Sequence, residues 1–329
     1  MTRIGYKLMS EEHGPSQLVT NAIRAEELGF DFVGISDHYS PWITEQGHSP
    51  FAWSVLGAIA HATERVGLMT GVTCPFRRYH PAIVAQAAAT VAVLSKGRFT
   101  LGLGSGELLN EHVIGESWPR VAVRHEYLAE AIDIIRQLFE GGEQSYSGRY
   151  LELANAELFD LPKKPPLIVV AAGGKEAAAL AAEKADGLVA VEASEELVSS
   201  YRDAGGKGPL YAECGVCWAP SAKKALDTLH RYHRWAVLGW SVLSELPRPK
   251  SFEEASEAVE PKRLEETPHG PDPASYLRAI DEFVDAGFDH VLLSQAGPDQ
   301  EGFFEFFERE LGPELESRKR PEPAGARAR

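Results

Sequence analysis

The sequence predicts an α/β protein of the (β/α)8 TIM-barrel class. Short β-branched runs that end in Gly, Ser or Asp alternate with Ala- and Leu-rich amphipathic stretches, which is the pattern of alternating strands and helices. Several of the short runs are apolar throughout, as is typical of parallel strands that are covered on both faces. Eight such units over roughly 300 residues favour one closed barrel over a pair of Rossmann halves.

Each expected strand is followed by an expected helix, except where longer connections interrupt the alternation. Hydrophobic periodicity and flanking Gly, Pro, Ser and Asp set the boundaries. The strands are expected at 3–8, 32–36, 66–72, 98–104, 167–172, 187–191, 208–216 and 288–294. The helices are expected at 16–28, 50–64, 81–94, 123–139, 176–185, 194–203, 222–236 and 273–286.

The domain organisation follows from these units. Residues 1–312 are expected to form a single barrel domain. Residues 141–152 are expected to form a loop with a short hairpin, and the Pro- and Glu-rich stretch 246–271 is expected to be an insertion before the last unit. Residues 313–329 mix Pro, Gly, Ala and charges with one large apolar residue, so a flexible charged tail is expected there.

Composition narrows the class of partner. The 329 residues carry 33 Lys and Arg against 48 Asp and Glu, a net charge of −15. This acidity disfavours nucleic acid and anionic membrane surfaces and leaves a small-molecule substrate as the expected partner. We expect neither a membrane helix nor a signal peptide. Three cysteines cannot build a disulfide framework, and the odd number suits the cytoplasm.

The second strand runs into a group of residues suited to proton transfer. In a barrel of this kind, the carboxyl ends of the strands face the active site. Asp37 and His38 follow the strand directly, and His38 can accept a proton near neutral pH. The alternative is a loop turn in which Asp37 caps a helix. The side chain of Trp42 is expected either to form the floor of a pocket that binds a ring or to cover the barrel mouth.

The fourth strand runs into the glycine-rich segment 102–106, followed by Glu107, Asn110 and Glu111. Glycines allow the backbone to approach a ligand closely. The spacing lacks the third glycine of the dinucleotide fingerprint, so Rossmann binding is not expected. Glu107 is expected to be a buried carboxyl that exchanges a proton with a ligand. The alternative is an acid that favours the start of a helix through the helix dipole.

Three further strand ends complete the expected site. The first strand leads to Glu11 and Glu12, either of which could reach the barrel mouth, and the third ends in small residues that suit a flat ligand. The fifth strand ends in two glycines and a lysine at the start of a helix, which together favour an anion. The residues expected at these last two strand ends are Gly71, Val72, Cys74, Ala172, Gly173, Gly174 and Lys175.

Other patterns carry weaker predictions. Cys214 and Cys217 form a CxxC without a second pair, so we expect core packing rather than zinc, and no metal site is expected. On a strand their side chains would face opposite sides. For His230 and His233 we expect a surface or packing role rather than metal ligation.

Together these strand-end motifs resemble the luciferase-like flavin and deazaflavin superfamily, and more narrowly the group of coenzyme F420-dependent glucose-6-phosphate dehydrogenases. The resemblance rests on the SDHxxPW motif at 36–42, Gly71-Val72, the GxGExLNE-type run at 104–111 and the Ala-Ala-Gly-Gly motif at 171–174. It covers roughly residues 3–312.

The resemblance implies a reaction and a cofactor. His38 would remove the proton of a hydroxyl group while hydride leaves the same carbon for C5 of the deazaflavin. Trp42 would flank the reacting alkoxide, Glu11 would orient or relay, and Glu107 would lie beside N1 of the cofactor and supply a proton. The cofactor would be coenzyme F420, with FMN as the alternative. Its contacts would be Asp37, Asn110, the peptide Gly71-Val72, and Gly173, Gly174 and Lys175 at the phosphate.

The sequence departs from that group where the sugar phosphate would be held. Residues 191–196 and 251–257 are acidic, and carboxylates there would repel a phosphate. We therefore expect an F420-dependent dehydrogenase of an uncharged alcohol, hemiacetal or sugar, acting as a homodimer. The alternatives are an F420H2-dependent reductase, an FMN-dependent monooxygenase, and a cofactor-binding protein without turnover.

Overall fold

Eight parallel strands close into a barrel, as the sequence predicts. The structure is a computed structural model and describes residues 2–319. Around the barrel the strand order is β1-β10-β9-β8-β7-β4-β3-β2, and every neighbouring pair is parallel. The barrel strands are β1 (Arg3–Leu8), β2 (Phe32–Ile35), β3 (Gly67–Thr70), β4 (Phe99–Leu103), β7 (Leu167–Ala171), β8 (Gly187–Ala190), β9 (Leu210–Val216) and β10 (His290–Gln295).

The helices cover the outside of the barrel, so that the strands are buried on both faces. This burial explains why the strands are apolar throughout. One large core lies between strands and helices, and a smaller cluster fills the barrel interior. The helices are α1 (Pro15–Glu27), α2 (Ala52–Ala62), α3 (Pro81–Leu94), α4 (Leu108–Glu111), α5 (Val121–Phe139), α6 (Lys175–Lys184), α7 (Glu195–Asp203), α8 (Ala222–His233), α9 (Trp240–Leu243), α10 (Pro249–Ser256), α11 (Pro273–Asp285), α12 (Gln300–Phe306) and α13 (Gly312–Lys319).

Aromatic rings close the end of the barrel at which the strands begin. The ring of Phe32 lies edge-on to Tyr211, with centroids 5.6 Å apart, and His290 lies 4.2 Å from Tyr211. A Cβ atom at Gly5 would come within 2.6 Å of the Phe32 ring, so only glycine fits there. With this end filled, the opposite end, where the strands terminate, is the end available to a ligand.

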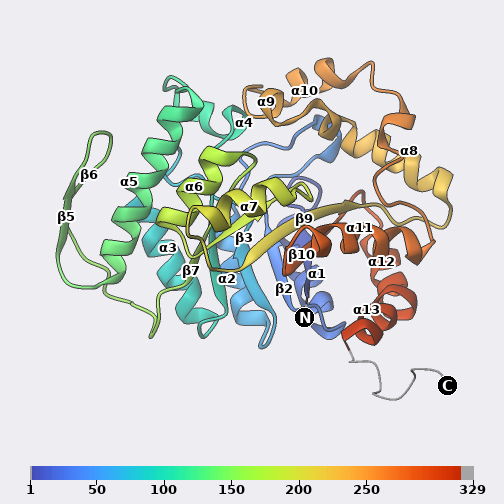
Figure 1. The fold of residues 1–329 in the computed structure, drawn as a ribbon, viewed down its shortest axis with the longest axis horizontal. Coiled ribbons are helices and arrows are strands. Elements are labelled where there is room, and N and C mark those ends of the chain that lie inside the picture. The colour runs from blue at the N-terminus through green and yellow to red at the C-terminus, as the bar shows by residue number, and fades with distance from the viewer. Residues whose placement is uncertain (1, 320–329) are drawn as a thin grey trace.

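Two additions lie outside the regular alternation (Figure 1). β5 (Gln144–Ser147) and β6 (Glu152–Ala156) form an antiparallel hairpin that extends from the left edge of the view, beyond α5. The segment after α8, with α9 and α10, runs along the upper edge. Shorter turns are the 3-10 helices Thr44–Gln46, His112–Ile114, Arg234–Leu238 and Pro261–Leu264 and the π-helical turn Phe307–Leu311.

The expected flexible tail needs a correction over its first residues. We expected disorder from residue 313, but α13 continues to Lys319. Its one large apolar residue, Leu315, is buried in the main core and gives the helix an anchored face. The remainder of the expected tail, 320–329, lies outside the described residues. No helix within residues 2–319 is both long and apolar enough to cross a lipid bilayer.

Candidate active site

The four residues expected to be catalytic lie together at the open end of the barrel. His38 follows β2, Glu11 lies in the turn after β1, and Glu107 lies between β4 and α4. His38 Nδ1 is 3.4 Å from Glu11 Oε1, and His38 Nε2 is 3.4 Å from Glu107 Oε2. The indole of Trp42 lies 4.9 Å from the imidazole, measured between ring centroids. The imidazole therefore has a carboxylate at each nitrogen and an aromatic ring beside it.

The carboxyl group of Glu107 is set up to hold a proton. Burial raises its pKa, and the nearby charge of His38 only partly opposes this effect. Asn110 Nδ2 donates to Glu107 Oε2 at 3.1 Å, and Asn110 Oδ1 accepts from the backbone of Tyr39 at 2.9 Å. Asn110 thus ties Glu107 to the loop that carries His38. A largely buried acid with a raised pKa is a typical proton donor in an active site.

Asp37 is held entirely by the loop after β3. It accepts hydrogen bonds from Thr73 Oγ1 at 2.7 Å, Tyr79 Oη at 3.0 Å and Arg78 Nη2 at 3.1 Å. These three donors use both carboxylate oxygens. The contact of Asp37 with a cofactor stays a prediction, whereas its contacts within the protein fix the position of the third strand's loop.

Glu111, the last residue of α4, is a titratable group that the sequence analysis did not assign to the site. The backbone N–H of Arg78 donates to Glu111 Oε2 at 2.8 Å. Burial raises the pKa of Glu111 to about 7, against the lowering effect of that hydrogen bond and of the Arg78 charge. Its place beside Asn110 on α4 was visible in the sequence, but its burial was not.

Small residues that follow β3 and β4 form a surface at the mouth, here called the ledge, which consists of Gly71, Val72, Cys74 and Gly104. The peptide Gly71-Val72 is cis, and Lys7 Nζ donates to the Gly71 carbonyl at 2.8 Å. A Cβ atom at Gly104 would approach the Val72 side chain to 2.6 Å. Cys74 is buried, and burial raises the pKa of its thiol well above the usual value. This surface suits a flat ring, and Cys74 serves as packing rather than as a nucleophile.

The end of β7 offers backbone donors. Gly174 precedes α6 without a side-chain cap, so the first N–H groups of the helix are not used by a capping side chain. A Cβ atom at Gly173 would meet nothing within 4 Å, and Ala172 is buried beside it. Lys175 is exposed and pairs with Glu196 at 2.8 Å, which offsets part of its charge.

Two of the buried donors that have no partner among residues 2–319 belong to Trp118 and to Arg124 of α5. They are Trp118 Nε1 and Arg124 Nε, and the guanidinium of Arg124 lies 4.3 Å from the centre of the Trp118 ring. A Cβ atom at Gly106 would come within 3.1 Å of Trp118 Cη2, so one edge of the indole ring lies against the glycine-rich turn.

Sequence reasoning missed the charged partners of two residues, Lys7 and His233. Lys7, inside the barrel, pairs with Glu213 at 2.6 Å. His233, for which we expected a surface or packing role, contacts Glu12 at 2.5 Å and is largely buried. These partners lie 206 and 221 positions apart in the chain, so no local pattern indicates them.

The core packing expected for Cys214 and Cys217 is confirmed by their burial. Cys214 and Cys217 are free and buried in two different apolar clusters. Burial raises the pKa of each thiol to about 12. Within the described chain no group of His, Cys, Asp and Glu side chains is arranged to hold a metal ion.

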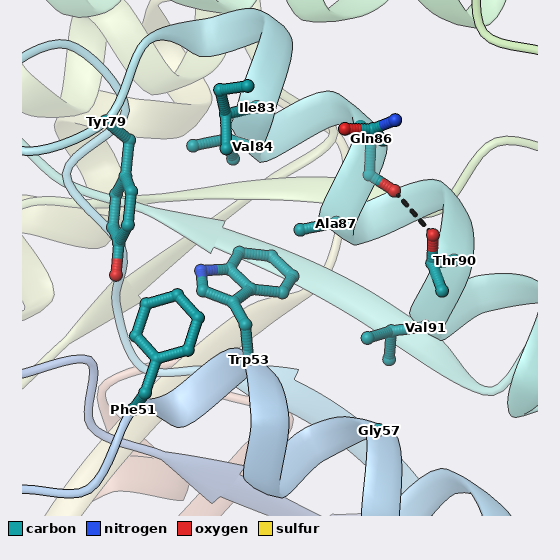
Figure 2. A pocket seen from close by; sticks show the side chains of 10 residues that line it. All are labelled: Phe51, Trp53, Gly57, Tyr79, Ile83, Val84, Gln86, Ala87, Thr90 and Val91. Atoms are coloured by element: carbon teal, nitrogen blue, oxygen red, sulfur yellow. Dashed lines mark hydrogen bonds between the residues drawn. The ribbon is translucent and has the colours of Figure 1, made fainter.

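A hollow lies on the outside of the barrel, and Tyr79, whose hydroxyl donates to Asp37, is one of the residues that line it. Figure 2 shows it between α2 and α3, with Phe51 and Trp53 facing Ile83, Ala87 and Val91. Its volume is about 280 Å³, and none of the residues that line it is an Asp, Glu, Lys, Arg or His. It therefore has no group for acid–base chemistry, and the barrel mouth remains the candidate active site.

Comparison with known proteins gives the class of the chain. A model of the luciferase-like monooxygenase family matches residues 1–300, and the chain belongs to this family. The resemblance found in the strand-end motifs is thereby confirmed.

Two relatives are F420-dependent glucose-6-phosphate dehydrogenases. That of Amycolatopsis mediterranei is 34% identical and is matched over 96% of this chain and 99% of the relative. That of Segniliparus rotundus is 35% identical over 96% of this chain and 98% of the relative.

Solved structures support the same fold. An F420-dependent secondary alcohol dehydrogenase, solved with an F420-acetone adduct, is 29% identical, with a TM-score of 0.87 over 93% of this chain and 97% of that chain. The F420-dependent tetrahydromethanopterin reductase of Methanopyrus kandleri is 20% identical, with a TM-score of 0.74 over 95% and 99% of the two chains. At that identity the reductase supports the fold alone.

Proposed function

We propose that this protein is an F420-dependent dehydrogenase that oxidises a CH–OH group of a small, uncharged alcohol, hemiacetal or sugar. The observation that carries the proposal is the imidazole of His38, held between Glu11 and Glu107 beside Trp42 at the barrel mouth. The names of the relatives and of the similar structure support both the cofactor and the CH–OH donor.

The residues at the mouth fit this cofactor. The ledge of Gly71, Val72 and Cys74 suits the flat ring, and the uncapped start of α6 with Gly173 suits the phosphate. When bound there, coenzyme F420 supplies an acceptor for a hydride.

The protein groups divide the proton chemistry between them. His38 accepts the hydroxyl proton of the substrate, and the resulting positive charge is stabilised by Glu11 at Nδ1. Glu107, with its raised pKa, holds a proton on the other side of the imidazole. Trp42 shields His38 from water and gives the substrate an apolar wall.

The charges at the start of α6 and in the insertion after α8 favour an uncharged substrate. Lys175 pairs with Glu196 at 2.8 Å, and in the insertion Lys262 pairs with Glu260 at 2.5 Å. Lys250 lies 3.9 Å from Glu254. Because each of these three lysines lies close to a carboxylate, together they attract a phosphate only weakly. Glucose-6-phosphate, which the relatives' names contain, is therefore the weaker candidate.

A panel experiment tests the proposed function. Purified protein is mixed with oxidised F420 and matched substrates: secondary alcohols, glucose and glucose-6-phosphate. We expect the deazaflavin absorbance to fall with an uncharged donor and to stay unchanged when His38→Ala replaces the wild type. Turnover with glucose-6-phosphate alone would overturn the substrate class, and absence of turnover with every donor would overturn the dehydrogenase. Parallel titrations with F420 and FMN identify the tighter cofactor.

We also propose that the protein works in the cytoplasm as a homodimer. The groove between α2 and α3 is the proposed contact, because it exposes Phe51 and Ile83 and carries no charge in a chain of net charge −15. Light scattering measures the mass in solution. We expect a dimer that Ile83→Lys converts to a monomer, whereas a monomeric wild type would contradict the proposal.

A further inference from the structure

A buried pair of opposite charges lies behind the aromatic wall of the proposed active site. Glu12 follows Glu11 in the turn after β1, and His233 is the last residue of α8. His233 Nε2 lies 2.5 Å from Glu12 Oε1, and the two side chains are 13% and 2% exposed. Glu12 Oε2 also accepts the backbone N–H of Gly297 at 2.7 Å. Neither Glu12 nor His233 has a part in the proton chemistry described above.

The first route from this pair to the site runs through Gln46. Gln46 Nε2 donates to Glu12 Oε1 at 3.2 Å. The carbonyl oxygen of the same side chain accepts the backbone N–H groups of Trp42 at 2.9 Å and Ile43 at 3.3 Å. Because one amide group makes these bonds, its orientation is fixed by Glu12 on one side and fixes the backbone of Trp42 on the other.

The second route runs through aromatic rings. The His233 ring lies 5.5 Å from the Trp235 ring. Trp235 in turn stacks on Trp42, with centroids 4.2 Å apart and planes inclined by 14°. Trp42 contacts His38 on its other side at 4.9 Å. The position of His233 therefore affects both the backbone and the indole ring of Trp42.

The charges of the pair depend on each other. Burial works to raise the pKa of Glu12, but the charge and hydrogen bond of His233 outweigh burial and lower it. Burial works to lower the pKa of His233, but Glu12 outweighs it, with smaller contributions from Glu11 and Glu213, and the pKa is raised. Removing His233 would leave a buried carboxylate without its cation, so the turn that also carries Glu11 would rearrange.

We infer that His233 is a positioning residue for the proposed reaction: its contact with Glu12 holds Trp42 against His38 through Gln46 and Trp235. The inference rests on the proposed function for its kinetic consequence. Its structural part, the placement of Trp42, is independent of which cofactor or substrate the protein uses. No step of the reaction passes through His233 itself.

The first test uses the apoprotein and needs no activity. We compare tryptophan fluorescence of the wild type, His233→Gln and the matched control His230→Gln. His230 lies one turn earlier on α8 and bonds to the Val259 carbonyl at 2.8 Å, outside the network. We expect the emission of His233→Gln to shift to the red, because Trp42 and Trp235 gain contact with water. An unchanged spectrum in His233→Gln, with the native fold shown by circular dichroism, would overturn the placement.

The second test measures coupling in the kinetics. We expect His233→Gln to lower kcat by about tenfold, with a smaller change in the KM for F420. In a Trp42→Phe background, the same substitution should lower kcat by less than about twofold, because its effect passes through Trp42. Equal losses in both backgrounds would overturn the positioning role. If no variant and no wild type turns over, the proposed function fails, and the fluorescence result still decides the placement.

Discussion

The two halves of the barrel mouth hold their charged side chains in different ways. On the side of β1 to β4, the side chains of Glu11, Asp37 and His38 are buried. Glu11 lies 3.4 Å from His38, and Asp37 accepts a hydrogen bond from Thr73 at 2.7 Å. On the side of β7 and β8, Lys175 and Glu196 form an ion pair in which the side chains are 69% and 74% exposed.

This difference indicates which side chains are held in fixed positions for the reaction and which can be changed with little effect on it. Buried groups interact strongly, because little water screens them, and their positions are set by several partners. Exposed pairs contribute little and are screened by salt. Substitutions on the first side should therefore abolish chemistry or change stability, whereas substitutions on the second side should only adjust the binding of charged ligands.

The largest effect is expected at His38. His38→Ala should lower kcat for F420 reduction by about 10²- to 10⁴-fold, because the hydroxyl proton loses its acceptor. Steady-state kinetics measures the loss, and circular dichroism checks the fold. His61→Ala, on the exposed face of α2, is the matched control and should keep full activity. Unchanged turnover in His38→Ala would show that the buried residues on the side of β1 to β4 take no part in the reaction.

The next effect concerns stability and its dependence on pH. The pKa of Glu111 is about 7 in the folded chain against 4.5 as its ordinary value. The bound proton therefore stabilises the fold fully below pH 4.5, and this contribution, of about 3 kcal/mol, is lost as the pH rises to 7. Glu111→Gln cannot lose a proton, so its free energy of unfolding should gain on the wild type between about pH 5 and 8. Denaturant titrations with a constant difference across that range would contradict the buried acid.

A smaller kinetic effect is expected at Glu107. Glu107→Gln should lower kcat by about 10- to 100-fold, because glutamine keeps a partner for Asn110 but has no proton to give. The wild-type rate should fall as the pH rises through the raised pKa of Glu107, and this limb should be absent from the variant. Glu183→Gln, on exposed α6, provides the control. A pH profile that is the same in both proteins would exclude Glu107 as the acid.

The smallest effect is expected at the exposed pair. Lys175→Ala should raise the Kd for F420 by less than about fivefold, because an exposed pair is worth under about 1 kcal/mol. Glu196→Gln should change the Kd by a similar factor in the opposite direction, since it frees the lysine. Fluorescence titration measures both. A far larger loss in Lys175→Ala would show that this half of the mouth is as fixed as the other.

The sequence was sufficient for the barrel and for the residues at the ends of its strands. Apolar runs without alternation indicate covered parallel strands, and the polar residues after them had to meet at one end of the barrel. His38 and Glu107 could be placed together in this way, without knowledge of any helix packing, whereas the choice of Glu11 over Glu12 came from the family resemblance.

Partnerships across the chain could not be predicted. The contact of Glu12 with His233 joins a turn near the start of the chain to the end of α8, and only the path of the segment after α8 creates it. The same holds for Lys7 and Glu213, which face each other inside the closed barrel. The tail was misjudged for a related reason, because the docking of Leu315 depends on a core formed by distant residues.

The most direct test of the central claim is the fate of the hydrogen on the reacting carbon. The protein is given oxidised F420 and an uncharged secondary alcohol that carries deuterium at its carbinol carbon, and the reduced cofactor is weighed by mass spectrometry. The site of His38, Glu11 and Glu107 predicts that the label is carried directly into the reduced cofactor, and that His38→Ala transfers none in the same time. Reduced cofactor without the label, or equal transfer by His38→Ala, would contradict it.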